Sequence, residues 1–182
     1  MKLQSTPTRV FAERSELIQV PAKGYLLRQG QVANQLYYIH RGALILLEDA
    51  GGSQLCQSFQ FEGAFYGSFT SLLCRIPSAY NLIALEDCLL EKLPYQHLPT
   101  SYLNKSGGRQ SALQIAEKLL KRESQRLYNQ LNQQAEQRYL DLLEEQPMAI
   151  YRVPLKHIAA HLGITPVTLS RLRKRISERE SS

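Results

Sequence analysis

The sequence predicts an α+β protein with a β-rich N-terminal unit, a long central helix and a compact helical unit at the C-terminus. Three observations carry this prediction. Short apolar stretches alternate with turn residues from about residue 20 to residue 93, residues 109–146 contain neither Gly nor Pro, and residues 155–172 have the spacing of two short helices joined by a tight turn. With 182 residues, 43% of them hydrophobic, the chain can form one large domain or two small ones.

Strand-like segments recur through the β-rich unit. Residues 36–39 (LYYI) and 43–47 (ALILL) are two of them, and turn signals such as Gln29-Gly30, Arg41-Gly42 and Glu62-Gly63 lie between the segments. Strands spaced roughly 8–12 residues apart with such turns are typical of a β-sandwich or barrel.

The stretch 109–146 begins with a narrow apolar seam. Steps of three and four residues place the apolar residues on one side of a helix whose flanks are polar. A helix of about 23 residues is roughly 35 Å long, and so narrow a stripe favours contact with a second copy. Packing on the chain's own β-unit is the alternative. The predicted dimer interface consists of Leu113, Ala116, Leu120, Leu127 and Leu131.

Residues 155–172 carry the most specific pattern, that of a helix-turn-helix. Gly163 supplies the positive φ that a tight turn needs. The small Ala159 lets the two helices approach closely, while Thr165 is a good N-cap and Pro166 suits the first helical position. A separate helix is expected just before this unit, because residues 139–143 (YLDLL) have an amphipathic pattern and precede Pro147.

The positive charge of the chain is concentrated at the same end. Residues 151–182 hold seven Lys or Arg and two Glu, a net charge of +5 out of the +6 of the whole chain. This charge predicts binding to a polyanion, and the helix-turn-helix pattern makes double-stranded DNA the expected one. Arg171 is the best candidate for a base contact, through guanine O6 and N7, and Val167 could contact a thymine methyl. Phosphate contacts are expected from Thr165, Thr168, Ser170, Arg173, Lys174 and Arg175, with a solvated helix face as the alternative for each.

The order of these parts resembles the Crp/Fnr family of bacterial transcription regulators, from about residue 15 to residue 176. The resemblance is carried by residues 23–30 and 37–42, which are similar to the family's first two hairpins, by Gly63 and residues 65–67 before its phosphate-binding cassette, and by residues 153–176 in its helix-turn-helix. At the start of the second helix, Pro166 and Val167 stand where many members have Arg and Glu. The target DNA sequence is therefore expected to differ from the best-known half-sites.

The resemblance implies three domains and a set of partners. These are a double-stranded, jelly-roll-like β-roll over residues 1–108, a dimerisation helix over 109–134 and a winged helix-turn-helix over 135–182. A cytoplasmic homodimer on a palindromic DNA site is expected, with RNA polymerase as a further partner.

The residues of the expected effector pocket depart from the family pattern. Members that bind cyclic nucleotides have a Glu after the cassette glycine and an Arg just before a small Ser/Thr-Ala pair. Here Ser68 follows the glycine, Pro77 precedes the pair, and Arg75 lies two positions too early. Because a buried phosphate without a cation is unfavourable by several kcal/mol, we expect no response to cAMP. The pocket is expected to hold an uncharged or non-nucleotide effector, or none. The candidate pocket consists of Tyr66, Gly67, Ser68, Arg75, Ser78, Ala79 and Ser124.

Alternative functions follow from the same residues. One is a sensor module in which binding of a cyclic nucleotide or another small ligand dominates, and another is a thiol-based redox sensor using Cys56, Cys74 or Cys88. An enzyme is not expected, because the sequence has no nucleophile–base set, phosphate loop or metal motif. No cofactor or metal is expected, and no apolar run approaches the roughly 20 residues of a membrane span.

Overall fold

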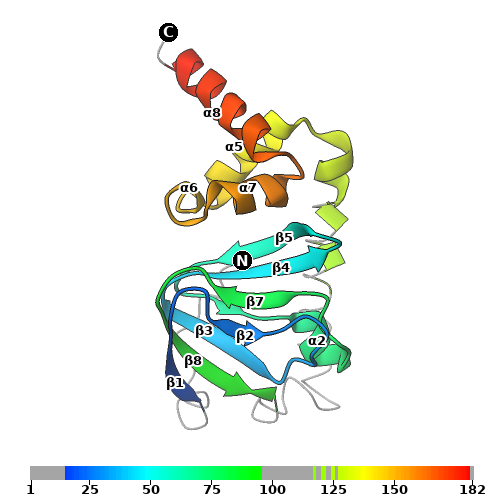
Figure 1. Cartoon of the computed structure of the whole chain (residues 1–182), viewed down its shortest axis with the longest axis vertical. Coiled ribbons are helices and arrows are strands. Elements are labelled where there is room, and N and C mark those ends of the chain that lie inside the picture. The colour runs from blue at the N-terminus through cyan, green and yellow to red at the C-terminus, as the bar shows by residue number, and fades with distance from the viewer. Residues whose placement is uncertain (1–14, 96–116, 118–119, 122–123, 126, 181–182) are drawn as a thin grey trace.

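The structure is a computed structural model that describes residues 15–95, 117, 120, 121, 124, 125 and 127–180. A two-sheet β-unit occupies one half of the molecule, and the helices that follow it in the chain are stacked on one of the two sheets (Figure 1). This confirms the α+β class and the β-sandwich expected for the N-terminal unit.

Eight strands in the described residues form two antiparallel sheets. One sheet has the order β1-β8-β3-β6 and the other the order β2-β7-β4-β5. The strands are β1 (Glu16–Val20), β2 (Tyr25–Leu27), β3 (Gln35–Arg41), β4 (Leu44–Ala50), β5 (Ser53–Gln60), β6 (Phe65–Tyr66), β7 (Asn81–Ala84) and β8 (Cys88–Pro94).

Strand β4 explains why one sheet carries helices on its outer face. Four consecutive apolar residues, 44–47, are all buried, although successive side chains of a strand point to opposite faces. Leu44 and Leu46 belong to the core between the two sheets, whereas Ile45 and Leu47 belong to the core shared with the helices. A strand buried on both faces needs this uninterrupted apolar run.

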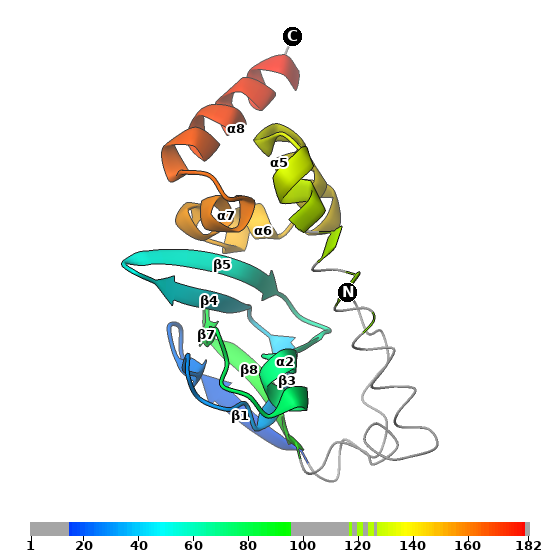
Figure 2. The ribbon, with the colours of Figure 1, turned by 90° about the vertical axis from the view of Figure 1, so that its right-hand side faces the viewer.

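In the described part of the chain, five continuous helices accompany the strands, besides the helical residues between 117 and 132. They are α2 (Phe69–Cys74), between strands β6 and β7, and α5 (Ala135–Glu145), α6 (Ala149–Arg152), α7 (Leu155–Leu162) and α8 (Pro166–Glu180). Helix α7 lies directly over β5, and α8 extends away from the sheets (Figure 2). The separate helix expected around residues 139–143 is α5.

The predicted wing has no counterpart in the described residues, because no strand occurs between Ala135 and Glu180. Residues 167–180 contain no Gly or Pro to start a hairpin, so α8 continues as one helix to Glu180. In the predicted dimer helix, the described residues from 117 to 132 are helical, whereas Leu113 and Ala116 lie outside the described part of the chain.

Candidate nucleic-acid interface and ligand pocket

Helices α7 and α8 are joined by three residues with the geometry that their sequence predicts. Gly163 has φ 67° and ψ 32°, the left-handed region in which glycine is favoured. The N–H of Ile164 donates to the carbonyl of Ala159 at 3.0 Å, which closes the end of α7. Thr165 caps α8, because its Oγ1 accepts the N–H of Thr168 at 3.1 Å.

The two helices share a buried core. Ile158 and Leu162 from α7, with Leu169 and Leu172 from α8, are each at most 3% exposed, and Ala159 is fully buried. These residues also pack against α5 and against the outer face of the sheet, in a single apolar cluster. The angle of α8 is therefore set by buried contacts on several sides.

The residues predicted to contact DNA lie on the free face of α8 and its preceding turn. Val167 is 60% exposed, although its side chain is apolar. Thr165 and Thr168 are exposed, and their hydroxyl oxygens lie 2.8 Å apart. The two hydroxyls are therefore hydrogen-bonded to each other at the N-terminus of α8. The other exposed residues of the set are Ser170, Arg171, Lys174 and Arg175, and Arg173 is half-buried.

The basic side chains of α8 differ in their partners. Lys174 pairs with Glu178 at 3.8 Å along the helix, while Arg175 lies 4.0 Å and Arg179 2.6 Å from Glu136 of α5. Within the described part of the chain, Arg171 and Arg173 have no ion-pair partner. The charge most available to a polyanion therefore lies in the middle of α8.

Arg138 of α5 is a positioning residue that the sequence reasoning missed. Its Nε and Nη2 donate to the carbonyl of Leu162 at 3.1 and 2.9 Å, at the last residue of α7. A guanidinium at a helix C-terminus satisfies carbonyl groups that the helix itself leaves free. It thereby ties the turn between α7 and α8 to α5.

The described part of the predicted dimer seam is exposed in the single chain. Leu120, Leu127 and Leu131 are 69%, 58% and 74% exposed, and the neighbouring Tyr128 is 59% exposed. These leucines therefore do not pack on the chain's own β-unit, which was the alternative to dimerisation.

The predicted effector pocket is only partly assembled. Ser68 and Ser78 are buried, and their hydroxyl oxygens lie 2.9 Å apart. Ser78 Oγ also lies 2.8 Å from the carbonyl of Tyr80 and accepts the Tyr80 N–H at 3.1 Å. The hydroxyl of Tyr66 lies 2.7 Å from that of Ser58 in the core. Gly67 is buried beside them, whereas Ala79 and Ser124 are exposed.

Arg75 is not brought to these serines. Its Nη1 donates to the carbonyl of Ala33 and its Nη2 to Asn34 Oδ1, both at 2.7 Å, and its guanidinium lies 4.9 Å from the ring centre of Tyr95. Arg75 ends α2 in the left-handed conformation, with φ 58°. In this structure the Arg75 guanidinium is therefore held by the loop before β3 and not by the two serines.

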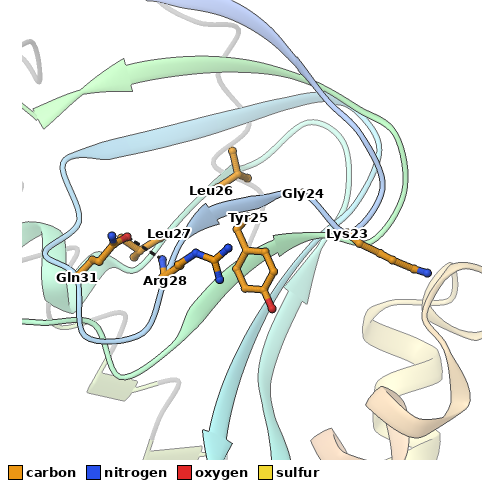
Figure 3. A pocket seen from close by; sticks show the side chains of 7 residues that line it. All are labelled: Lys23, Gly24, Tyr25, Leu26, Leu27, Arg28 and Gln31. Carbon is orange, nitrogen blue, oxygen red and sulfur yellow. Dashed lines mark hydrogen bonds between the residues drawn. The ribbon is translucent and has the colours of Figure 1, made fainter.

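A groove that the sequence did not predict lies beside β2 (Figure 3). It has a volume of about 410 Å³, and the Arg28 guanidinium lies 4.1 Å from the ring centre of Tyr25. Its lining residues are Lys23, Gly24, Tyr25, Leu26, Leu27, Arg28 and Gln31, none of which belongs to the predicted pocket.

The three cysteines are free thiols in different environments. Cys56 and Cys88 are buried, whereas Cys74 is exposed. Burial raises the pKa of the Cys88 thiol, which lowers the fraction of reactive thiolate at neutral pH. No group of three or more metal-ligating side chains and no helix able to span a membrane occurs in the described residues.

Comparisons with known proteins agree with this architecture. Residues 17–100 match the family model of the cyclic nucleotide-binding domain. FixK2 from Bradyrhizobium japonicum has a similar structure, with a TM-score of 0.75 and 16% identity over 91% of this chain and 86% of that chain. A CooA mutant from Carboxydothermus hydrogenoformans has a TM-score of 0.69 and 14% identity, over 97% of this chain and 83% of that chain.

A third similar structure is CLP from Xanthomonas campestris, described as a c-di-GMP-responsive global regulator. Its TM-score is 0.67 and its identity 18%, over 94% of this chain and 90% of that chain. Identities this low establish a shared fold. A comparison with curated protein sequences found no match.

Proposed function

We propose that the chain is a homodimeric transcription regulator that reads a palindromic DNA site through α8 and does not respond to cAMP. The match of residues 17–100 to the cyclic nucleotide-binding domain model and the likeness of the fold to Crp/Fnr regulators support this proposal. The single observation that carries the proposal is the free face of α8. There Arg171 is exposed and has no ion-pair partner among the described residues.

The geometry of α8 suits the major groove of DNA. A recognition helix places the residues of its N-terminal half against base edges and its flanking cations against phosphates. The N-terminal half of α8 exposes Val167, Thr168, Ser170 and Arg171, so it offers one apolar contact, two hydroxyls and one guanidinium. Helix α7 is covered by β5 on its other side, which leaves α8 as the accessible helix of the pair.

Dimerisation is supported by the exposed leucines of the central helix. Leu120, Leu127 and Leu131 follow one another at steps of seven and four residues on a helix whose described side chains are mostly exposed. A second copy would bury them in a coiled-coil-like contact. Two α8 helices related by two-fold symmetry would then reach half-sites about 34 Å apart, one turn of DNA.

The absence of a cAMP response is supported by the hydrogen bonds around Ser68. Its hydroxyl is already paired with Ser78, and the guanidinium of Arg75 is held by Ala33 and Asn34. A cyclic phosphate at Ser68 would therefore displace an existing hydrogen bond without gaining a cation partner.

Binding of the purified protein to a duplex selected from random sequence tests the proposal. We expect a palindromic site, a dimer by sedimentation equilibrium, and an affinity that falls steeply with salt and does not change with cAMP. Arg171→Ala should relax specificity at one base position by about 1–3 kcal/mol, whereas the control Lys174→Ala should weaken all sequences equally. A monomer, or binding without salt dependence, would refute the proposal.

A further inference from the structure

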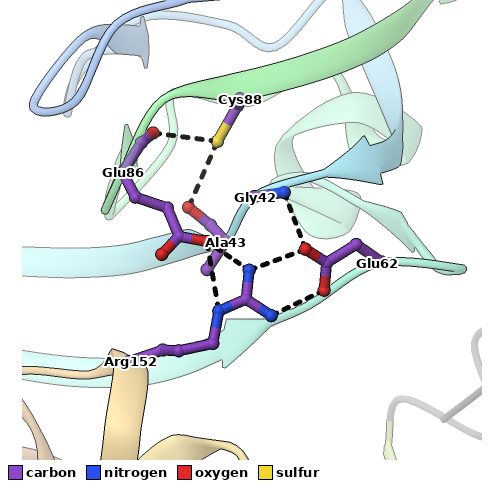
Figure 4. Close-up of polar contacts among 6 residues, drawn as sticks. All are labelled: Gly42, Ala43, Glu62, Glu86, Cys88 and Arg152. Carbon is purple, nitrogen blue, oxygen red and sulfur yellow. Dashed lines mark hydrogen bonds and ion pairs between the residues drawn. The ribbon is translucent and has the colours of Figure 1, made fainter.

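Arg152, the last residue of α6, makes a polar contact between the helices and the β-unit (Figure 4). Its Nη1 and Nη2 donate to the two carboxylate oxygens of Glu62 at 2.7 and 2.6 Å. Its Nε donates to Glu86 Oε1 at 3.1 Å, and its Nη2 contacts the same oxygen. One guanidinium thus holds two carboxylates that lie 90 and 66 residues away in the sequence.

The arginine of this contact is largely shielded from solvent, whereas both carboxylates are partly exposed. The Arg152 side chain is only 18% exposed, and its guanidinium lies 5.0 Å from the ring centre of Phe61. Glu62 also accepts the N–H of Gly42 at 2.8 Å. The hydrogen bonds from Arg152 lower the pKa of Glu62 to about 2, so Glu62 stays ionised at neutral pH.

The two carboxylates bracket one segment of the β-unit, residues 63–85, which we call the cassette segment. Glu62 lies immediately before it and Glu86 immediately after it. The segment contains β6, α2 and β7, together with the buried pair Ser68 and Ser78. Arg152 therefore touches both ends of the part of the chain in which an effector pocket is expected.

On the other side, Arg152 is connected stiffly to the helices beyond it. Only Val153 and Pro154 separate α6 from α7, and Val153 is buried. Proline has a fixed φ, so this connection has little freedom to absorb a displacement. Helix α7 in turn shares its buried core with α8.

From this arrangement we infer that Arg152 is a positioning residue that couples the cassette segment to helices α7 and α8. A displacement of either end of the segment moves one carboxylate relative to the other. Arg152 cannot follow both, so the displacement is passed to α7 and α8. The effect on DNA rests on the function proposed above, whereas the coupling itself does not.

The remainder of the interface between the β-unit and the helices does not favour one position so strongly. Most of it is formed by apolar side chains, among them Ile45 and Phe59 of the sheet and Ile158 of α7. One hydrogen bond accompanies them, between His161 Nδ1 and the carbonyl of Cys56 at 3.3 Å. The ring of His161 also lies 5.1 Å from that of Phe59. Apolar contacts are non-directional, whereas a guanidinium that grips two carboxylates fixes distance and orientation. Loss of Arg152 should therefore leave the helices docked but uncoupled.

Amide hydrogen exchange on the full chain, without DNA, tests this coupling. Ser78→Val perturbs the cassette segment, because it removes the contacts of Ser78 with Ser68 and Tyr80. With Arg152 present, we expect it to raise the exchange rates of the α7 and α8 amides by about tenfold. In an Arg152→Met background the same change should raise them less than about twofold.

A matched control is Arg179→Met, which breaks an ion pair with Glu136 inside the helical unit and touches no residue of the cassette segment. In that background the effect of Ser78→Val should remain as large as in the wild type. Where either main variant fails to fold, Ser78→Thr and Arg152→Lys replace them, since Lys keeps the charge without the two-oxygen grip.

Equal effects of Ser78→Val with and without Arg152 would overturn the inference. The proposed function is judged separately, by binding of the wild-type dimer to its selected palindrome. The exchange ratio is the factor by which Ser78→Val raises the exchange rates of the α7 and α8 amides, measured with and without Arg152. If the wild type binds DNA but these two ratios are equal, the coupling is wrong and the function stands. If the ratios differ and no DNA is bound, the coupling stands and the function is wrong.

Discussion

Replacing Gly163 by Ala tests whether the turn between α7 and α8 sets the position of α8, the helix proposed above to read DNA. Gly163 has φ 67°, and a Cβ added there has no atom within 4 Å. The cost is therefore limited to backbone strain in the left-handed region, about 1–2 kcal/mol. Gly51→Ala is a matched control, because Gly51 has φ +57°, equally open space and a place in the hairpin between β4 and β5.

Urea denaturation and DNA titration of both variants separate stability from function. Gly51→Ala should lower the free energy of unfolding by about 1–2 kcal/mol. Gly163→Ala should lower it by less, because rotation of α8 relieves part of the strain in the free protein, and the m-value should not change in either variant. Only Gly163→Ala can release its strain by rotating α8 against α7. Because the DNA contact proposed for α8 requires the native angle, the relieved strain reappears as an affinity loss of roughly 5- to 30-fold.

Two results would refute this reasoning. A loss of stability for Gly163→Ala much larger than for Gly51→Ala would mean that the turn is not open. An equal DNA affinity of the two variants would mean that the angle between α7 and α8 does not control recognition.

Three further predictions concern stability. Burial lowers the pKa of His157 from 6.5, so His157 takes up a proton in the unfolded chain before it does so in the folded protein as the pH falls. Urea denaturation should therefore show full stability above about pH 6.5 and a loss of stability below it. This loss should be smaller in His157→Gln. The pKa of Glu62 is lowered from 4.5 to about 2 by its arginine partner. The contribution of Glu62 to the free energy of unfolding should therefore be complete above pH 4.5 and vanish towards pH 2. Glu62→Gln should remove this pH-dependent contribution. Gly42→Ala should cost about 1–3 kcal/mol more than Gly30→Ala in the same assay, since both have positive φ but only the Cβ at Gly42 meets a backbone atom, at 2.9 Å.

The sequence was most informative where structure is decided by neighbouring residues. The left-handed turn at Gly163, the cap at Thr165 and the start of α8 at Pro166 are all local, and each was predicted correctly. The apolar run 43–47 was predicted to be a strand. The run did not show that α7 covers the outer face of this sheet. A continuous apolar run indicates that both faces of a strand are buried, but not which element buries them.

Contacts between residues distant in the chain could not be predicted from spacing. Arg138 binds a carbonyl 24 residues away, and Arg152 binds carboxylates 66 and 90 residues away. Arg75 lies near Ser78 in the sequence, yet its side chain is not brought to that serine. Its backbone turns into the left-handed region at the end of α2, and its guanidinium is held by the loop before β3 instead.

The net charge of the C-terminal segment overstates the charge that is available to DNA. Of its seven basic residues, Arg152 is held by two carboxylates and Arg179 by a contact of 2.6 Å. Lys174 and Arg175 are 79% and 60% exposed in pairs of 3.8 and 4.0 Å, which are weak enough to yield to a phosphate. The remaining three, Lys156, Arg171 and Arg173, have no ion pair in the described structure. Each protomer should therefore neutralise roughly three to five phosphates, and a dimer should show a slope of log K against log[salt] of about −5 to −9. A steeper slope would require basic residues outside the helical unit to contact the DNA.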